Sequence, residues 1–355
     1  MPISGRSRGP RPVTARDRLP ISPLRVRRLP LSGDLRLADA GSAPFGALAY
    51  GDANIGDWLS GVDAQVLSPG GPVADVWQAG NDVAIGTTGA AHWRSDGQWA
   101  IGRIDLDESA EGQTLEILAQ RAYQDLFQAL KDTDCPHLLR IWNYLPRINA
   151  DGGGLERYRQ FNLGRQKAFL DAGQAAFDGA PAACALGIRQ GALGIRFLAG
   201  QRAPVPIENP RQVSAYRYPS AYGPRAPTFS RAALAELGGG SIALFISGTA
   251  SIVGHESVHV GDVAAQTQET LRNLAAVIDA ARQRTDAPFD VAALDAVVYV
   301  RHAADASVVR SVLQAELGAA SQTVREAVFL EADVCRQDLL VEIEAHAVAA
   351  GRLNA

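Results

Sequence analysis

Two parts of the sequence repeat the same succession of elements, and this repeat constrains the fold more than any other feature. The segments QTLEILAQRAYQDLFQAL, near residue 114, and QTQETLRNLAAVIDAA, near residue 266, both place apolar residues at helical spacing. A strand follows each helix, LRIWNYL or LDAVVYV, which aligns Tyr144 with Tyr299. A strand ending in small residues precedes each, VAIGTTGAAH or LFISGTASIVGH. We therefore expect two copies of one domain.

The repeat and the composition divide the chain into four parts. Residues 1–29 hold eight arginines, one acid and several prolines, so we expect a disordered tail over residues 1–34. Residues 35–175 form the first copy and residues 241–355 the second. Residues 176–240, rich in Gly, Pro and Ala, connect them and carry a substrate-binding segment. Each copy would have hairpins, a long helix, a strand, a second helix and closing strands, which predicts an α+β fold.

Composition excludes several classes of protein. A net charge of -4 argues against a general nucleic-acid binder, and no apolar run approaches the roughly 18 residues that span a bilayer. The three cysteines are widely spaced, which suits a reducing compartment such as the cytoplasm. His255 and His259 lie close together, but the sequence suggests no third ligand for a metal. We therefore expect a soluble protein whose partner is a small molecule.

The closing strand, Leu339 to Val348, carries three ionisable side chains on one face. Glu342, Glu344 and His346 alternate with apolar residues, which is the periodicity of a strand with one packed face. The polar face is either solvated or part of a site.

The second half, Ile242 to Val348, resembles the RidA/YjgF family in its element order, its FISG segment and its closing VEIEA motif. In that family the first glutamate of this motif is the catalytic acid or base, in a cleft between the subunits of a trimer. The resemblance implies that Glu342 is catalytic and makes a homotrimer the precedent for assembly. The segment EADVCRQD replaces the family's stretch with a carboxylate-binding arginine, so Arg336 is assigned no role.

The whole chain resembles the chorismatases, which join two such domains. The matching segments are RIWNYLPRIN, LERYRQFNLGRQKAF, NPRQVSAYRYPSAYGPRAPTF, FISGTASIVGHE and ADVCRQDLLVEIEA. The resemblance implies two RidA/YjgF-like (chorismate mutase-like) units with mixed sheets, each covered by helices. It also implies cleavage of chorismate to pyruvate and a cyclic acid. The branches of the family form 3-hydroxybenzoate, a mixture of 3- and 4-hydroxybenzoate, or, by hydrolysis, 3,4-dihydroxycyclohexa-1,5-dienecarboxylate.

Chorismate has two carboxylates and an enolpyruvyl ether, so a site must hold two negative charges. Arginine suits this task because its fork binds a carboxylate in a fixed orientation. The candidates are Arg157 and Arg165, eight residues apart on one predicted helix, and Arg217, between two tyrosines. A solvated helix face is the alternative for the first two. Tyr144 and Tyr216 are candidates for hydrogen bonds to a carboxylate or to the ring hydroxyl, although Tyr144 also fits a core position.

Glu342 would protonate the enol methylene, and burial beside apolar neighbours would raise its pKa as that task needs. Glu344 would support it. Gly248 and Cys335 match pocket positions that the hydroxybenzoate-forming branch fills with Gly and Cys, which favours 3-hydroxybenzoate as the product. Alternatively, Gly248 is a glycine at a strand end that lets another segment approach closely, and Cys335 is a small buried apolar residue. Acid catalysis and charge neutralisation call for no metal or organic cofactor.

Two other functions compete with this one. The first is a non-catalytic, ligand-binding member of the RidA-like superfamily, and the second is an imine deaminase like the single-domain RidA proteins. The arginine-rich helix and the AYRYP segment favour catalysis over a scaffold. The duplication argues against a deaminase.

Overall fold

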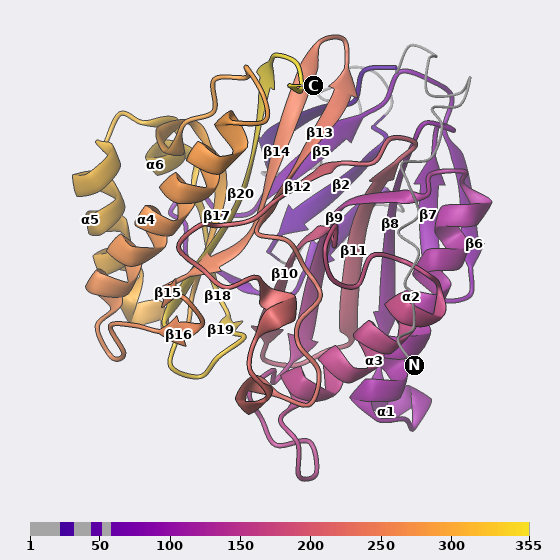
Figure 1. Cartoon of the computed structure of the whole chain (residues 1–355), viewed down its shortest axis with the longest axis horizontal. Coiled ribbons are helices and arrows are strands. Elements are labelled where there is room, and N and C mark those ends of the chain that lie inside the picture. The colour runs from indigo at the N-terminus through magenta and orange to yellow at the C-terminus, as the bar shows by residue number, and fades with distance from the viewer. Residues whose placement is uncertain (1–21, 32–43, 52–57, 355) are drawn as a thin grey trace, which may run out of the picture.

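A computed structural model describes residues 22–31, 44–51 and 58–354 of the chain. In this part of the chain the strands form two seven-stranded sheets, a four-stranded sheet and a two-stranded hairpin (Figure 1). The α+β class predicted from the sequence is confirmed.

The first large sheet has the strand order β19-β10-β9-β11-β8-β7-β6. Its strands are β6 (Ala84–Thr88), β7 (Ala91–Ser95), β8 (Trp99–Leu106), β9 (His137–Pro146), β10 (Ala182–Ile188), β11 (Leu193–Gly200) and β19 (Asp333–Val334). The sheet is mixed, because β10 runs parallel to β9 while the neighbours β9, β11, β8, β7 and β6 alternate in direction. Strands β10 and β11 come from the stretch that was expected to connect the copies.

The second large sheet has the order β12-β13-β14-β20-β17-β18-β4. Its strands are β4 (Gln65–Val66), β12 (Val205–Ile207), β13 (Ala232–Gly238), β14 (Ser241–Ala250), β17 (Asp295–Val300), β18 (Val328–Glu331) and β20 (Val341–Ala350). Read from its opposite edge, this order matches the first sheet strand for strand.

The registers of the two sheets show the duplication residue by residue. Tyr144 on β9 pairs with Gly194 on one side and with Leu186 on the other. Tyr299 on β17 pairs with Glu342 and Leu330 in the same way. The two halves also exchange their edge strands, because β19 joins the first sheet and β4 joins the second. One alignment in the sequence was wrong: β8 corresponds to β14, whereas VAIGTTGAAH forms the β6–β7 region.

Helices cover the outer face of each large sheet, at opposite sides of the molecule (Figure 1). The first sheet packs against α2 (Leu115–Asp132) and α3 (Arg157–Asp171), with α1 (Glu108–Glu111) before them. The second packs against α4 (Val263–Arg282) and α5 (Ala306–Leu317), followed by α6 (Gln322–Glu326). The inner faces of both sheets share a third apolar core, to which the small sheet contributes. Any polar group on these inner faces is therefore held away from water.

The four-stranded sheet, of order β1-β5-β2-β3, includes part of the segment that was expected to be a disordered tail. Its strands are β1 (Arg25–Pro30), β2 (Gly46–Tyr50), β3 (Leu59–Val62) and β5 (Val73–Gln78). Contrary to that expectation, β1 pairs with β5 over six residues, and Arg28 forms a buried ion pair with Asp75. Strand pairing satisfies the backbone hydrogen-bonding groups of β1, and Asp75 neutralises the charge of Arg28. The basic composition of this segment gave no sign of either contact. The rest of the predicted tail, residues 1–21 and 32–34, lies outside the described residues.

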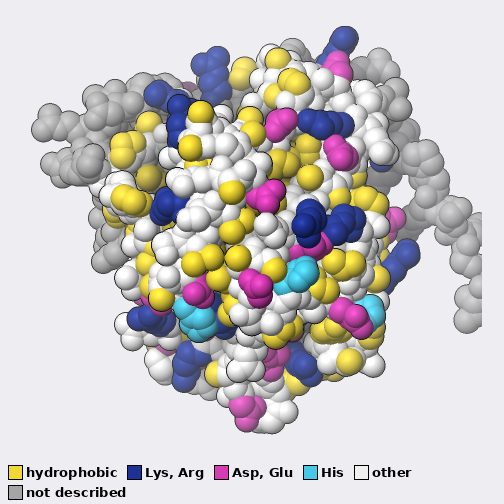
Figure 2. All heavy atoms as spheres, turned by 90° about the vertical axis from the view of Figure 1, so that its left-hand side faces the viewer, with side chains coloured by type: hydrophobic (Ala, Val, Ile, Leu, Met, Phe, Trp, Pro, Cys, Tyr) yellow, Lys and Arg dark blue, Asp and Glu magenta, His cyan; other side chains and the backbone are white. Residues whose placement is uncertain are grey.

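The side of the molecule formed around α4 and α5 has a mixed surface. Figure 2 shows basic, acidic and apolar side chains interspersed across this face, as is usual for solvent-facing helices. Among the described residues, no helix has both the length and the apolar character that crossing a membrane requires.

Candidate active site

The closing strand β20 turns its three ionisable side chains inward, Glu342 and Glu344 toward the first large sheet and His346 toward the four-stranded sheet. Glu342, Glu344 and His346 are all buried there, with exposed fractions of 3%, 2% and 7%. The alternating residues Val341 and Ile343 lie in the core under α4 instead. The solvated alternative for this face is therefore wrong, and the reason is the sheet that covers it.

Glu344 is held by groups from both copies. Arg140 on β9 donates a hydrogen bond from Nη2 to Oε2 of Glu344, and the hydroxyl of Tyr299 donates to Oε1 at 2.7 Å. Tyr144 in turn lies within hydrogen-bond distance of Tyr299. Sequence analysis missed Arg140, although an arginine inside the apolar run LLRIWNYL was a signal, since buried arginines are almost always paired.

Glu342 has a different environment from Glu344. Burial, with the negative charge of Glu344 as the second cause, raises the pKa of Glu342 from 4.5 to about 8. No hydrogen bond of its carboxyl to another described residue is found. The Glu342 side chain lines a cavity of about 670 Å³. At neutral pH it is therefore a protonated acid facing open space.

Gly248 makes room for that acid. A Cβ built on Gly248 would overlap with Oε1 of Glu342, and it would lie only 2.7 Å from Cδ of Glu342 and 3.3 Å from Cβ of Cys184. Gly248 also lines the cavity, as does Cys335. Burial and the charge of Glu342 raise the pKa of Cys335 to about 12, so its thiol is neutral at pH 7. The three residues predicted to be catalytic thus meet at one cavity, where Cys335 can shape the wall but is a poor nucleophile.

Both copies build this cavity within one chain. The first copy contributes residues from 149 to 159, the connecting stretch residues from 218 to 231, and the second copy residues from 248 to 257 and from 335 to 342. The second copy alone supplies the buried acid, because the register places Gly194 of the first copy where the second has Glu342.

Arg231 brings a buried guanidinium to the cavity. Its side chain, from the residue before β13, is 4% exposed and lines the cavity. Its Nη2 donates to the carbonyl of Val213 at 2.9 Å and to the hydroxyl of Tyr218 at 2.7 Å. Its Nε has no hydrogen-bond partner among the described residues. Arg231 therefore brings a positive charge to the cavity wall and is held there by two hydrogen bonds. Sequence analysis missed Arg231; the arginine that opens the apolar strand RAALAEL was the available signal.

Arg336 is a second lining cation with a spare donor. Its guanidinium carbon lies 5.0 Å from the ring centre of Tyr218 and 4.1 Å from that of Tyr222. Its Nη1 donates to the carbonyl of His255 at 2.8 Å, while its buried Nη2 has no partner in the described part of the chain. The two rings fix the plane of the guanidinium. Sequence analysis assigned this arginine no role.

The other residues predicted to bind substrate do not line the cavity. Tyr144 lies between the sheets, next to Tyr299. Arg157 forms an ion pair with Glu108 and donates to the carbonyl of Pro146.

Three further candidates also lie away from the cavity walls. Arg165 is buried among aromatic rings, with its guanidinium carbon 5.1 Å from the ring centre of Tyr123. Arg217 is exposed and stacks on the ring of Tyr216, which packs against Phe177. Helical spacing and neighbouring tyrosines could not tell which guanidinium faces a cavity, because that depends on how the two copies meet.

The comparisons with known proteins agree on one family. The family model "Chorismatase FkbO/Hyg5-like, N-terminal" matches residues 75–199. The chain is 37% identical over 286 residues to the 3-hydroxybenzoate synthase of Streptomyces hygroscopicus, covering 77% of this chain and 81% of that protein. It is 38% identical over 278 residues to a chorismatase of Streptomyces rapamycinicus, covering 76% and 81%. A crystal structure of a chorismatase matches with a TM-score of 0.79 and 30% identity over 93% of this chain and 99% of that one.

Proposed function

The chain belongs to the chorismatase family, and on this premise we propose that it converts chorismate into 3-hydroxybenzoate and pyruvate. The observation that carries the proposal is the protonated Glu342, which opens onto a cavity lined by Arg231 and Arg336. A substrate with two carboxylates and an acid-labile ether matches this combination of groups.

We propose that the two arginines hold the two carboxylates of chorismate. Both guanidinium groups line the cavity and carry a positive charge, which a carboxylate of the substrate would neutralise. Both are also anchored by other groups, so little ordering is needed when substrate binds. This assignment replaces Arg157, Arg165 and Arg217, which do not line the cavity.

Glu342 would supply the proton. A carboxylic acid with a pKa of about 8 is mostly protonated at pH 7, and it can transfer that proton to the terminal methylene of the enolpyruvyl group. The ether carbon then becomes an oxocarbenium ion, whose C3–O bond weakens. The carboxylate left on Glu342 can take up a proton later in the cycle, so the residue is regenerated.

The fate of the ring decides the product. In the proposed route the C4 hydroxyl of chorismate attacks C3, the C3–O electron pair leaves with pyruvate, and the hydroxyl proton returns to Glu342. The resulting arene oxide opens at C4, hydrogen moves from C3 to C4, and loss and gain of a proton give 3-hydroxybenzoate. Substrate and products balance without water (C₁₀H₁₀O₆ to C₇H₆O₃ and C₃H₄O₃). Gly248 and Cys335 would set how the ring sits and whether water reaches C3.

Incubation of the purified protein with chorismate tests the proposal, with chromatography of the aromatic acids and an assay for pyruvate. Equal amounts of pyruvate and 3-hydroxybenzoate are expected. Accompanying 4-hydroxybenzoate would indicate the mixed-product branch, and the dihydroxycyclohexadiene acid would indicate hydrolysis. No pyruvate above the spontaneous background would refute enzymatic action on chorismate and favour the ligand-binding alternative.

We propose cytoplasmic action, which the three free cysteines support. The cavity is built within one chain, so catalysis would not need a second chain to complete it. The homotrimer of the RidA/YjgF precedent remains a proposal for assembly, and light scattering on the purified protein would test it.

A further inference from the structure

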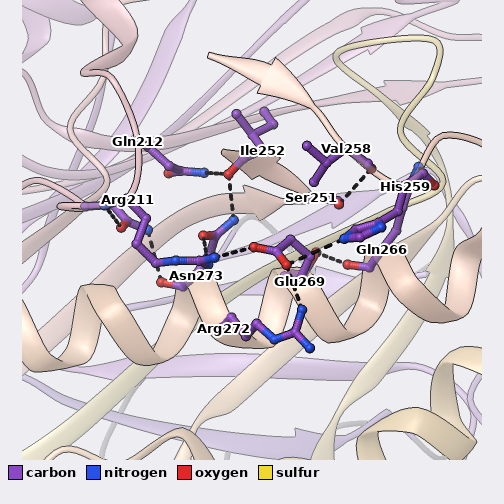
Figure 3. Close-up of polar contacts among 12 residues, drawn as sticks. Arg211, Gln212, Ser251, Ile252, Val258, His259, Gln266, Glu269, Arg272 and Asn273 are labelled. Atoms are coloured by element: carbon purple, nitrogen blue, oxygen red, sulfur yellow. Dashed lines mark hydrogen bonds and ion pairs between the residues drawn. The ribbon is translucent and has the colours of Figure 1, made fainter. Parts of the chain in front are cut away.

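Helix α4 carries a row of polar side chains on a face that is buried. Gln266, Glu269 and Asn273 follow one another at helical spacing, and their exposed fractions are 0%, 4% and 0%. Burying such groups costs free energy unless each one is hydrogen-bonded. These three residues are here called the α4 row, and Figure 3 shows that it bonds to segments outside the helix, such as Arg211, in addition to Arg272 on α4 itself.

Asn273 holds the end of strand β14. Its side-chain amide donates to the carbonyls of Ala250 at 3.0 Å and Ile252 at 2.9 Å (Figure 3). Both acceptor residues line the cavity, two and four positions after Gly248. The position of Asn273 is thus coupled to the strand end that leaves room for Glu342.

Glu269 and Asn273 together hold Arg211. Arg211 donates from Nη2 to Oε1 of Glu269 and from Nη1 to Oδ1 of Asn273 (Figure 3). Two residues later, the carbonyl of Val213 accepts the hydrogen bond from Arg231. The backbone of this loop also bonds to Gly254 on both sides, through Val213 N and Arg211 O. A chain of hydrogen bonds therefore runs from α4 to the guanidinium in the cavity wall.

Gln266 holds the segment that enters strand β20. Its side-chain amide donates to the carbonyl of Asp338 at 2.9 Å, and its Oε1 accepts from the backbone N–H of Leu340 at 2.7 Å. Asp338 lines the cavity, and Leu340 lies two residues before Glu342. The third wall of the cavity is thus tied to the same helix face.

We propose that the α4 row positions three walls of the cavity: the end of β14, the loop that holds Arg231, and the segment before β20. Arg211 connects the row to the loop whose Val213 carbonyl binds Arg231. None of the row's residues lines the cavity, so they are positioning residues and not catalytic ones. The expected effect on turnover rests on the proposed function. The expected effect on how rigidly the cavity walls are held does not.

The comparison of two arginines that share Glu269 tests the proposal. Arg211→Gln removes the link to the wall. Arg272→Gln is the matched control, because Arg272 also donates to Glu269 but is half-exposed and lies one turn away on the same helix. We expect Arg211→Gln to raise the KM for chorismate about tenfold, with kcat changed less than about threefold, because a charge-assisted hydrogen bond is lost behind a binding group. Arg272→Gln should stay within about twofold of wild type in both constants. Arg211→Lys should have a KM between those of the wild type and Arg211→Gln.

Hydrogen exchange of the same variants, without substrate, gives a second readout. Arg211→Gln should speed exchange at the amides of Val213 and Gly254, while Arg272→Gln should leave them protected. Equal KM values and equal exchange in the two variants would overturn the positioning role. If the wild-type protein releases no pyruvate, the proposed function fails, and the exchange comparison alone decides the positioning role.

Discussion

The hydroxyl groups of Tyr144 and Tyr299 lie 3.1 Å apart, although the residues are 155 positions apart in sequence. The two residues occupy equivalent positions in the two copies, so the pseudo-twofold axis that relates the copies runs between their hydroxyl groups. Symmetry ends one strand away, where Tyr144 pairs with Gly194 and Tyr299 pairs with Glu342. At this position of the duplicated scaffold, only the second copy therefore has an acid, Glu342.

Replacing Glu342 by Gln should abolish turnover and leave binding largely intact. The amide keeps the shape of the side chain but cannot give a proton to carbon, so we expect kcat to fall at least about 10²-fold. Pyruvate release measures turnover, and the rise of the melting temperature with added chorismate measures binding. A variant that turns over at nearly the wild-type rate would show that another group is the acid.

Turnover should fall as pH rises through about 8. Glu342 must be protonated to act, and its pKa of about 8 places the loss of the proton there. The pH profile of kcat/KM for the wild-type protein, which reports the groups of the free enzyme, measures this alkaline limb. A profile that stays flat to pH 10 would exclude Glu342 as the acid.

The same titration links stability to pH. The pKa of Glu342 rises from 4.5 to about 8 on folding, so the folded chain retains a proton that the unfolded chain releases. The protonated carboxyl contributes fully to the free energy of unfolding below about pH 4.5. This contribution, on the order of 5 kcal/mol, is lost as pH rises to about 8. Denaturant unfolding of wild type and Glu342→Gln at pH 5 and pH 8.5 measures it, and the wild type should lose more. Equal losses would mean that the carboxyl is not protonated in the folded state.

Replacing Glu344 by Gln should move the alkaline limb of the kcat/KM profile to lower pH. The negative charge of Glu344 helps to raise the pKa of Glu342, so its removal lowers that pKa. Arg140 also loses its buried charged partner, so the free energy of unfolding should fall by about 3–5 kcal/mol. A stable variant with an unchanged pH profile would contradict the coupling of the two carboxyls.

Replacing Gly248 by Ala should reduce turnover and change the products. The added methyl group would overlap with the carboxyl of Glu342, which must then move. We expect kcat to fall about tenfold or more, since displacement by about 1 Å can cost 10²-fold, and the share of the hydrolysis product to rise. Gly70→Ala is the control, because a Cβ there meets nothing within 4 Å. If both variants keep the wild-type rate and product, Gly248 has no part in the choice of product.

Glu342→Gln should bind one chorismate per chain. The first copy has Gly194 in place of the acid, and the pseudo-equivalent position to Glu344 is Arg196, which pairs with Asp105. Calorimetric titration with chorismate measures the number of sites. Two equivalent sites per chain would mean that the first copy has kept a binding function of its own.

The sequence by itself determined the local elements and the duplication. The apolar spacing of residues 114–130 and 266–281 predicted α2 and α4, and the alternation around Glu342 predicted β20, because these periods depend only on backbone geometry. The role of Glu342 as the acid was predicted from the resemblance of its motif to the RidA/YjgF family, and it remains a proposal. The buried face of β20, by contrast, looked the same as a solvated one, since a strand's own pattern does not say what covers it.

Only the tertiary structure decided which cations face the acid. Arg140, Arg231 and Arg336 lie 91 and 105 positions apart along the chain. In the folded chain Arg140 bonds to Glu344, while Arg231 and Arg336 line the cavity onto which Glu342 opens. Arg157, a better candidate by spacing, is paired with Glu108 instead. The exchange of β4 and β19 between the sheets and the addition of β1 were also invisible in the sequence, since pairing between distant strands depends on contacts that no local pattern records.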